Sequence, residues 1–91
     1  MTHHPTAREI ETWLIARIGE LTANPADSID PDRPMEAYGL TSVMAVGMSA
    51  DLEDWLGISV EATIVWDRPT VSALADYLAE ILTAGGHQER A

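Results

Sequence analysis

The stretch that decides the fold runs from Tyr38 to Gly57 and has the sequence YGLTSVMAVGMSADLEDWLG. After a glycine turn, apolar residues recur every three or four positions, which predicts a helix from about Ser42 to Leu56 that ends at Gly57. The large apolar side should face the core and consists of Ala45, Met48, Leu52 and Leu56. The opposite side should be exposed and consists of Val43, Gly47, Ala50 and Asp54.

An earlier helix is predicted from about residue 7 to residue 22. Thr6 and Glu9 fit a capping box, in which the Thr6 hydroxyl accepts from the Glu9 N–H and the Glu9 side chain reaches back to Thr6. The apolar stripe behind the box consists of Ile10, Trp13, Leu14, Ile18 and Leu21. This spacing indicates an amphipathic helix with one buried face.

The region between these two helices, from Ala23 to Leu40, is predicted to be a long loop. Three prolines interrupt it, and proline removes a backbone donor and biases the preceding residue toward extended conformations. Loops of this length are uncommon in a compact domain without a role. We therefore expect apolar side chains to anchor it in the core, namely Ile29, Met35, Tyr38 and Leu40.

The remaining sequence predicts one short and one long helix. Residues 58–66 are apolar and β-branched, which fits a short strand or a buried helical turn, and the lack of a partner strand favours a short irregular helix. Thr70 should cap a final helix that begins at about Val71 and is closed by Gly85-Gly86. The predicted fold class is all-α, a small four-helix bundle with a short third helix and a long loop between the first two. Residues 1–91 should form one domain with a core at about 7–84 and flexible ends at 1–5 and 87–91.

Composition excludes several classes of function. The chain has 91 residues, no Lys, 15 acidic residues against 5 Arg, and a formal net charge of −10. This charge should repel nucleic acid and anionic membrane surfaces, whose binding depends on clustered basic side chains. Without Cys there is neither a disulfide nor a thiolate metal site. Because no basic, apolar leader or spanning segment is found, the expected location is the cytoplasm.

Residues for intrinsic catalysis or metal binding are lacking. The histidines stand at the chain ends, at His3, His4 and His87, so no ordered imidazole is expected beside a serine. Asp30-Pro31-Asp32 resembles the start of a calcium loop, but Met35 and Thr41 occupy the places of its required Gly and Glu. We expect neither an enzyme nor a metal site.

Ser42 is the candidate functional residue. A serine at a helix start is often only an N-cap, but Ala45 stands where a capping box would need Glu, and Thr41 could cap equally well. A hydroxyl in the first helical turn, after a glycine turn, should be exposed to another enzyme. If a phosphate were esterified there, the unpaired N–H groups and the helix dipole would favour its negative charge.

Three segments together resemble the acyl carrier proteins of the phosphopantetheine-attachment family, over about residues 7–84. They are residues 34–46 (PMEAYGLTSVMAV), 52–58 (LEDWLGI) and 66–71 (WDRPTV). The resemblance implies the carrier-protein bundle, with Ser42 as the serine that a phosphopantetheinyl transferase loads from coenzyme A. The 4′-phosphopantetheine arm would then hold acyl groups as thioesters, and its thiol would be imported rather than supplied by a cysteine.

The same resemblance implies a non-catalytic carrier in polyketide or fatty-acyl-derived biosynthesis. Its partners would be the transferase, an acyl-loading enzyme such as an acyl-AMP ligase or an acyltransferase, and a ketosynthase or another biosynthetic enzyme. The carrier itself is expected to be a monomer.

Docking to these partners is expected at the start and on the exposed side of helix 42–56. The expected docking residues are Leu40, Thr41, Val43, Gly47, Ala50, Asp51 and Asp54. The acidic group Asp51, Glu53 and Asp54 would steer partners with basic patches, so salt should weaken docking. Thr41 departs from the family pattern, which usually has Asp there, and Gly47 stands where many relatives have Glu.

Two alternatives to the acyl carrier remain open. One is a peptidyl carrier that holds aminoacyl groups, and the other is an unmodified helical interaction domain, which the neutral Thr41 favours. A small hydrolase is a third class, for which the chain offers no base. Core packing is expected for Trp13, Trp55 and Trp66, with an acyl or pantetheine contact as the alternative for Trp55 and Trp66.

Overall fold

The first helix, α1, spans Ala7–Thr22 and begins with the predicted capping box. In this computed structural model, which describes the backbone of residues 4–88 and the side chains of residues 4–84, the Glu9 N–H donates to the Thr6 hydroxyl at 3.1 Å. The Thr6 N–H donates to the Glu9 carboxylate at 2.7 Å. Two otherwise unpaired donors are thereby satisfied, and the predicted start of α1 is confirmed.

The long loop is held in place as predicted. It contains two short 3₁₀ turns, η1 at Ala26–Ser28 and η2 at Met35–Tyr38. The buried anchors are Ile29, Met35 and Leu40, while Tyr38 is half-buried. The Tyr38 hydroxyl also accepts a hydrogen bond from the Asp30 N–H at 2.7 Å.

The loop is also tied to the beginning of the last helix by two backbone hydrogen bonds. The Met35 N–H donates to the Pro69 carbonyl at 2.7 Å, and the Ser72 N–H donates to the Pro31 carbonyl at 2.9 Å. These bonds satisfy main-chain groups that the prolines leave without regular partners. The middle of the loop that leads to Ser42 is therefore tied to the start of α4.

The second helix, α2, spans Ser42–Leu56, and Gly57 follows it with a φ of +72°. Glycine reaches this left-handed conformation without the steric cost that a Cβ would impose, so the predicted helix end is confirmed. The next helical turn, α3, spans only Ile64–Asp67, preceded by an irregular segment. The expectation of a short irregular helix rather than a strand is therefore correct, although its regular part begins late in the predicted range.

The last helix, α4, spans Val71–Gln88, and Thr70 caps it by accepting from the Ala73 N–H at 3.1 Å. The predicted end at Gly85-Gly86 is wrong, because the helix continues through both glycines. Glycine ends a helix only when it takes the left-handed conformation, and within residues 4–88 only Gly39 and Gly57 are glycines with positive φ. A helical glycine lowers stability by about 1 kcal/mol relative to alanine but breaks no hydrogen bond. Residues 1–3 and 89–91 of the expected flexible ends lie outside the described part of the chain.

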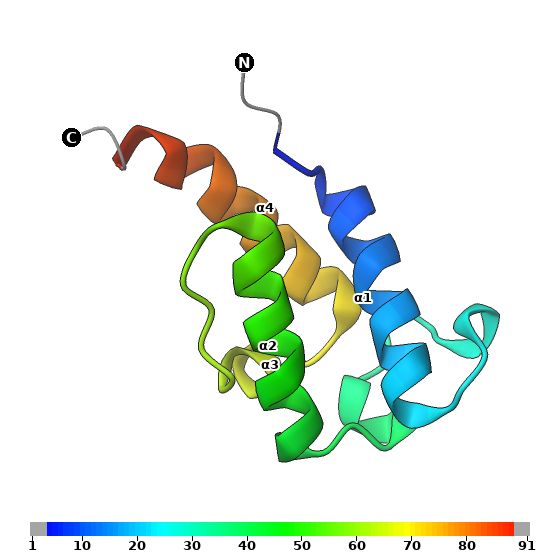
Figure 1. The fold of residues 1–91 in the computed structure, drawn as a ribbon. Coiled ribbons are helices and arrows are strands. Elements are labelled where there is room, and N and C mark those ends of the chain that lie inside the picture. Colours follow the sequence, from blue (N-terminus) through cyan, green and yellow to red (C-terminus); the bar gives the residue numbers. More distant parts are fainter. Residues whose placement is uncertain (1–3, 89–91) are drawn as a thin grey trace.

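One hydrophobic core joins all the main helices. α1 and α4 pack side by side, and α1 runs in the direction opposite to both α2 and α4, so that α2 begins at the end of the bundle remote from the start of α1 (Figure 1). The core is supplied by all four α-helices and by the loop, and its fully buried large side chains are Ile10, Leu14, Ile18, Met35, Met48, Leu52, Val65, Val71, Leu74 and Leu78. No helix within the described residues is long and apolar enough to cross a membrane.

Candidate functional site

Ser42 is the first residue of α2 and is exposed. The N-cap is Thr41, whose hydroxyl accepts from the Met44 N–H at 3.2 Å and whose carbonyl accepts from the Ala45 N–H at 2.9 Å. Of the two candidate caps, the structure therefore selects Thr41. Among the described residues no hydrogen-bond partner is found for the Ser42 hydroxyl. Its oxygen is available to an external reagent.

The turn before Ser42 is fixed by buried and hydrogen-bonded neighbours. Leu40 is only 4% exposed, and Gly39 has a φ of +93°, which a residue with a Cβ rarely adopts. The Asn24 side-chain amide donates to the Tyr38 carbonyl at 3.1 Å and to the Thr22 hydroxyl at 2.8 Å. Because these contacts hold the loop against the end of α1, Ser42 is presented from a fixed position.

The site has the chemistry of an acceptor rather than that of a catalyst. A serine hydroxyl is a weak nucleophile unless a neighbouring base removes its proton, and here it has no such hydrogen-bonded neighbour within residues 4–84. Its position in the first turn does suit an anionic ester, because first-turn N–H groups and the helix dipole favour negative charge. The local structure therefore suits a phosphate group placed on Ser42 by another enzyme.

The exposed side of α2 matches the predicted pattern and adds one residue. Val43, Gly47, Ala50 and Asp54 are all exposed. Sequence reasoning missed Val46, which is 57% exposed and lies between Val43 and Ala50 on the same side. The spacing in the sequence could have identified Val46, because it lies three residues after Val43 and four before Ala50, and such positions share a helix face.

Three of the predicted docking and steering residues are placed differently from the expectation. Leu40 belongs to the core, so its side chain does not reach the surface. Asp51 is half-buried and forms an ion pair with Arg17 of α1. The Glu53 carboxylate accepts a hydrogen bond from the Val60 N–H at 2.7 Å and ties the segment before α3 to α2. These two carboxylates hold parts of the domain together, which the sequence pattern did not indicate.

The tryptophans divide between the core edge and the surface. Trp13 and Trp55 stack with their ring centroids 5.3 Å apart and their planes 18° apart, and Arg17 lies 6.0 Å from the Trp13 ring. Trp55 is 40% exposed and Trp66 is 42% exposed, so the expectation of core packing is wrong for Trp66 and only partly right for Trp55. The residues next to Trp66 explain its exposure, since Val65 takes the buried position of this single helical turn.

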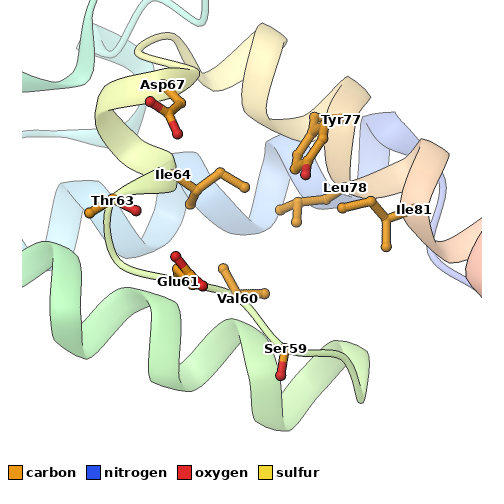
Figure 2. A pocket seen from close by; sticks show the side chains of 9 residues that line it. All are labelled: Ser59, Val60, Glu61, Thr63, Ile64, Asp67, Tyr77, Leu78 and Ile81. Atoms are coloured by element: carbon orange, nitrogen blue, oxygen red, sulfur yellow. The ribbon is translucent and has the colours of Figure 1, made fainter.

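A cavity of about 340 Å³ lies between the α2–α3 segment, α3 and α4. Figure 2 shows Val60 and Ile64 on one side of it and Leu78 and Ile81 of α4 on the other. Its lining is Ser59, Val60, Glu61, Thr63, Ile64, Asp67, Tyr77, Leu78 and Ile81. No residue of α2 lines it, so this cavity is separate from the site at Ser42.

Comparisons with known proteins agree with this geometry. A family model described as "Phosphopantetheine attachment site" matches residues 12–78, a range that includes Ser42. The chain is 38% identical over 72 residues to a phenolphthiocerol/phthiocerol polyketide synthase of Mycobacterium tuberculosis, covering 79% of this chain but 4% of that protein. It is 30% identical over 74 residues to the acyl carrier protein TtuC of Teredinibacter turnerae, covering 81% of this chain and 85% of TtuC. The chain therefore spans a small part of the synthase but most of TtuC.

The fold is likewise similar to a solved structure. A free-standing peptidyl carrier protein from a secondary metabolic pathway of Acinetobacter baumannii superposes with a TM-score of 0.83 and 33% sequence identity. The match covers 87% of this chain and 99% of that one. The four-helix fold is thus shared with a protein of known structure.

Proposed function

Because the chain belongs to the phosphopantetheine-attachment family, we propose that Ser42 is the residue to which its phosphopantetheine is attached. The chain is a carrier domain related to those of polyketide synthases and to peptidyl carrier proteins, and the family's cofactor is a covalently attached 4′-phosphopantetheine. One observation supports the choice of residue above all. Ser42 is exposed at the start of α2 while its neighbour Thr41 performs the capping that would otherwise occupy a serine hydroxyl.

The attachment step proceeds as a transfer from coenzyme A. The Ser42 oxygen attacks the phosphorus that bears the pantetheine, and the pyrophosphate P–O bond to the nucleotide breaks. Adenosine 3′,5′-bisphosphate leaves, and the hydroxyl proton passes to a base of the transferase. The chain supplies the oxygen and its fixed position, whereas the base must come from the transferase because none is hydrogen-bonded to Ser42 among the described residues.

The residues at the site suit the group that would be bound there. When attached, the arm supplies a thiol that holds acyl groups as thioesters. The first turn of α2 would stabilise the phosphodiester charge, and the anchored loop, through Leu40 and Tyr38, would keep the attachment point fixed while the arm moves. The domain itself carries the cargo and presents it.

The proposed partners are the transferase, an acyl-loading enzyme and a ketosynthase or another biosynthetic enzyme. The proposed docking surface is the exposed side of α2, which begins at the residue next to Ser42. Leu40 is buried and supports this surface from the core, and Asp51 supports it through its ion pair with Arg17. The similarity to a polyketide synthase favours acyl cargo of the polyketide or fatty-acyl type.

A peptidyl carrier is the second candidate, because the superposed free-standing structure is a peptidyl carrier protein. The two functions are separated by loading the modified protein with adenylating enzymes of each kind. An acyl carrier should accept fatty acyl groups from an acyl-AMP ligase, whereas a peptidyl carrier should accept amino acids from an amino-acid adenylating enzyme. Intact mass identifies the group that is added.

The attachment residue is tested by incubating the purified protein with coenzyme A and a broad-specificity phosphopantetheinyl transferase. The wild type should gain the mass of one phosphopantetheine, and Ser42→Ala should gain none. Ser59→Ala is the matched control, because Ser59 is also an exposed serine but lies beyond α2. An unchanged wild-type mass, or equal gains in wild type and Ser42→Ala, would refute the proposal and favour an unmodified interaction domain.

A further inference from the structure

The cavity between the α2–α3 segment, α3 and α4 has the size and the lining of a small-molecule site. Such sites in proteins occupy about 300–1,000 Å³ and combine an apolar lining with a few polar groups. This cavity measures about 340 Å³. Its apolar lining comes from both walls, with Val60 and Leu78 buried and Ile64 and Ile81 half-buried (Figure 2). An apolar chain can therefore be covered here without any change in the helices.

Five polar side chains surround this apolar lining. They are Ser59, Glu61, Thr63, Asp67 and Tyr77. Tyr77 is half-buried and the other four are exposed, so they form the rim of the cavity. Within residues 4–84, no hydrogen bond or ion pair engages the side-chain oxygens of these five residues. The oxygens are available to the polar end of a ligand whose apolar part lies deeper.

The charge of the rim selects the kind of polar end. Glu61 and Asp67 contribute two carboxylates, and none of the nine lining residues is basic. Arg68 does not line the cavity, because its guanidinium lies over the Tyr77 ring, 4.4 Å from the ring centre. A positively charged group at the rim is therefore attracted, whereas a carboxylate is repelled.

We propose that this cavity binds a short aliphatic amine, with its apolar chain against Ile64, Leu78 and Ile81 and its ammonium group beside the carboxylates of Glu61 and Asp67. An ammonium group donates three hydrogen bonds and accepts none, which matches a rim whose carboxylates only accept. The amine comes either from solution or from the end of a cargo on the Ser42 arm. Only the second source rests on the proposed function.

The test compares three probes that share one chain and differ in the polar end, namely hexylamine, hexanol and hexanoate. Each is titrated into the unmodified, isotope-labelled protein, and binding is followed by the amide chemical shifts of Val60, Ile64 and Leu78. Hexylamine should bind with a Kd on the order of 1 mM, as expected for a ligand of this size. Hexanol should bind about fivefold more weakly, because it lacks the charge, and hexanoate more weakly still.

Variants of the rim separate the carboxylates from the apolar lining. Glu61→Gln/Asp67→Asn should weaken hexylamine binding about fivefold and leave hexanol binding unchanged. Asp54→Asn is the matched control, since Asp54 is an exposed acid of α2 outside the cavity, and it should leave the binding of both probes unchanged. Both rim positions are exposed, and circular dichroism melting verifies that each variant is folded.

Shifts that do not saturate, equal binding of the three probes, or an equal loss in Asp54→Asn would overturn the inference. The source of the amine is identified by loading the Ser42 arm with an aminohexanoyl or a hexanoyl group. Larger shifts at the same amides with the aminohexanoyl group assign the site to cargo, whereas shifts with free hexylamine alone assign it to an amine from solution. Either result supports the site. Failure of the arm to load would refute the proposed function and leave the result with free hexylamine unaffected.

Discussion

Thr41 and Ser42 divide two tasks between adjacent hydroxyl groups. Thr41 accepts from the Met44 N–H and closes the first turn of α2, so the Ser42 oxygen stays free for chemistry. Sequence alone left the cap open between these two residues, because both are good N-caps and neither is followed by the acid of a capping box. Only the backbone geometry, with Thr41 extended and Ser42 helical, decides which hydroxyl faces the first-turn N–H groups.

Replacing Thr41 tests this division. Thr41→Ala should lower the free energy of unfolding by about 1 kcal/mol, because the Met44 N–H loses its acceptor. Thr41→Asp should retain the cap and add a favourable charge–dipole interaction of about 0.3–1 kcal/mol. Urea denaturation followed by circular dichroism measures both changes, with Thr41→Ser as the control that keeps the hydroxyl. Equal stability of Thr41→Ala and wild type would mean that the cap lies elsewhere.

At the scale of elements, α1 and α2 are joined by a cluster that crosses between them. Trp13 stacks on Trp55, and Arg17 pairs with Asp51. The helices themselves follow from local signals such as the capping box at Thr6. The contacts between helices do not, because a stacked pair or an ion pair far apart in sequence has no periodic signature. For this reason the sequence predicted that Asp51 steers partners, whereas in the structure it forms an ion pair with Arg17 of α1.

The Trp13–Trp55 stack should show a measurable coupling energy. In a double-mutant cycle with Trp13→Leu and Trp55→Leu, the two changes should be non-additive by about 0.5–1.5 kcal/mol of unfolding free energy. A parallel cycle with Trp13→Leu and Trp66→Leu is the control and should be additive to within about 0.5 kcal/mol. Thermal or urea denaturation gives both sets of values. Additive effects in the first cycle would contradict a stabilising stack.

At the scale of the whole molecule, the sequence predicted the number, order and most ends of the helices. Gly57 ends α2 because its backbone takes the left-handed conformation. Gly85 and Gly86 do not take it, so α4 continues through both residues. The exposed position of Ser42 at a helix start was also predictable, from its place between a glycine turn and a helix. The exposure of Trp66 was not predictable, since it depends on which neighbours cover its helical turn in three dimensions.

The assembled bundle holds the proposed attachment point, Ser42, at the exposed start of α2. Core residues from all four α-helices hold the bundle together, and the loop anchored by Ile29 and Met35 brings the chain to Ser42. A bundle of this kind needs no internal rearrangement to present its hydroxyl. Loading should therefore leave the fold unchanged.

The most direct test of the central claim is to locate the added group within the chain. Cleavage after Glu36 and Glu53 of the loaded protein releases residues 37–53, whose hydroxyl side chains other than tyrosine are Thr41, Ser42 and Ser49. Tandem mass spectrometry of this peptide should place one phosphopantetheine on Ser42 in every modified copy. A phosphopantetheine on Thr41, on Ser49 or on any other peptide would contradict the account.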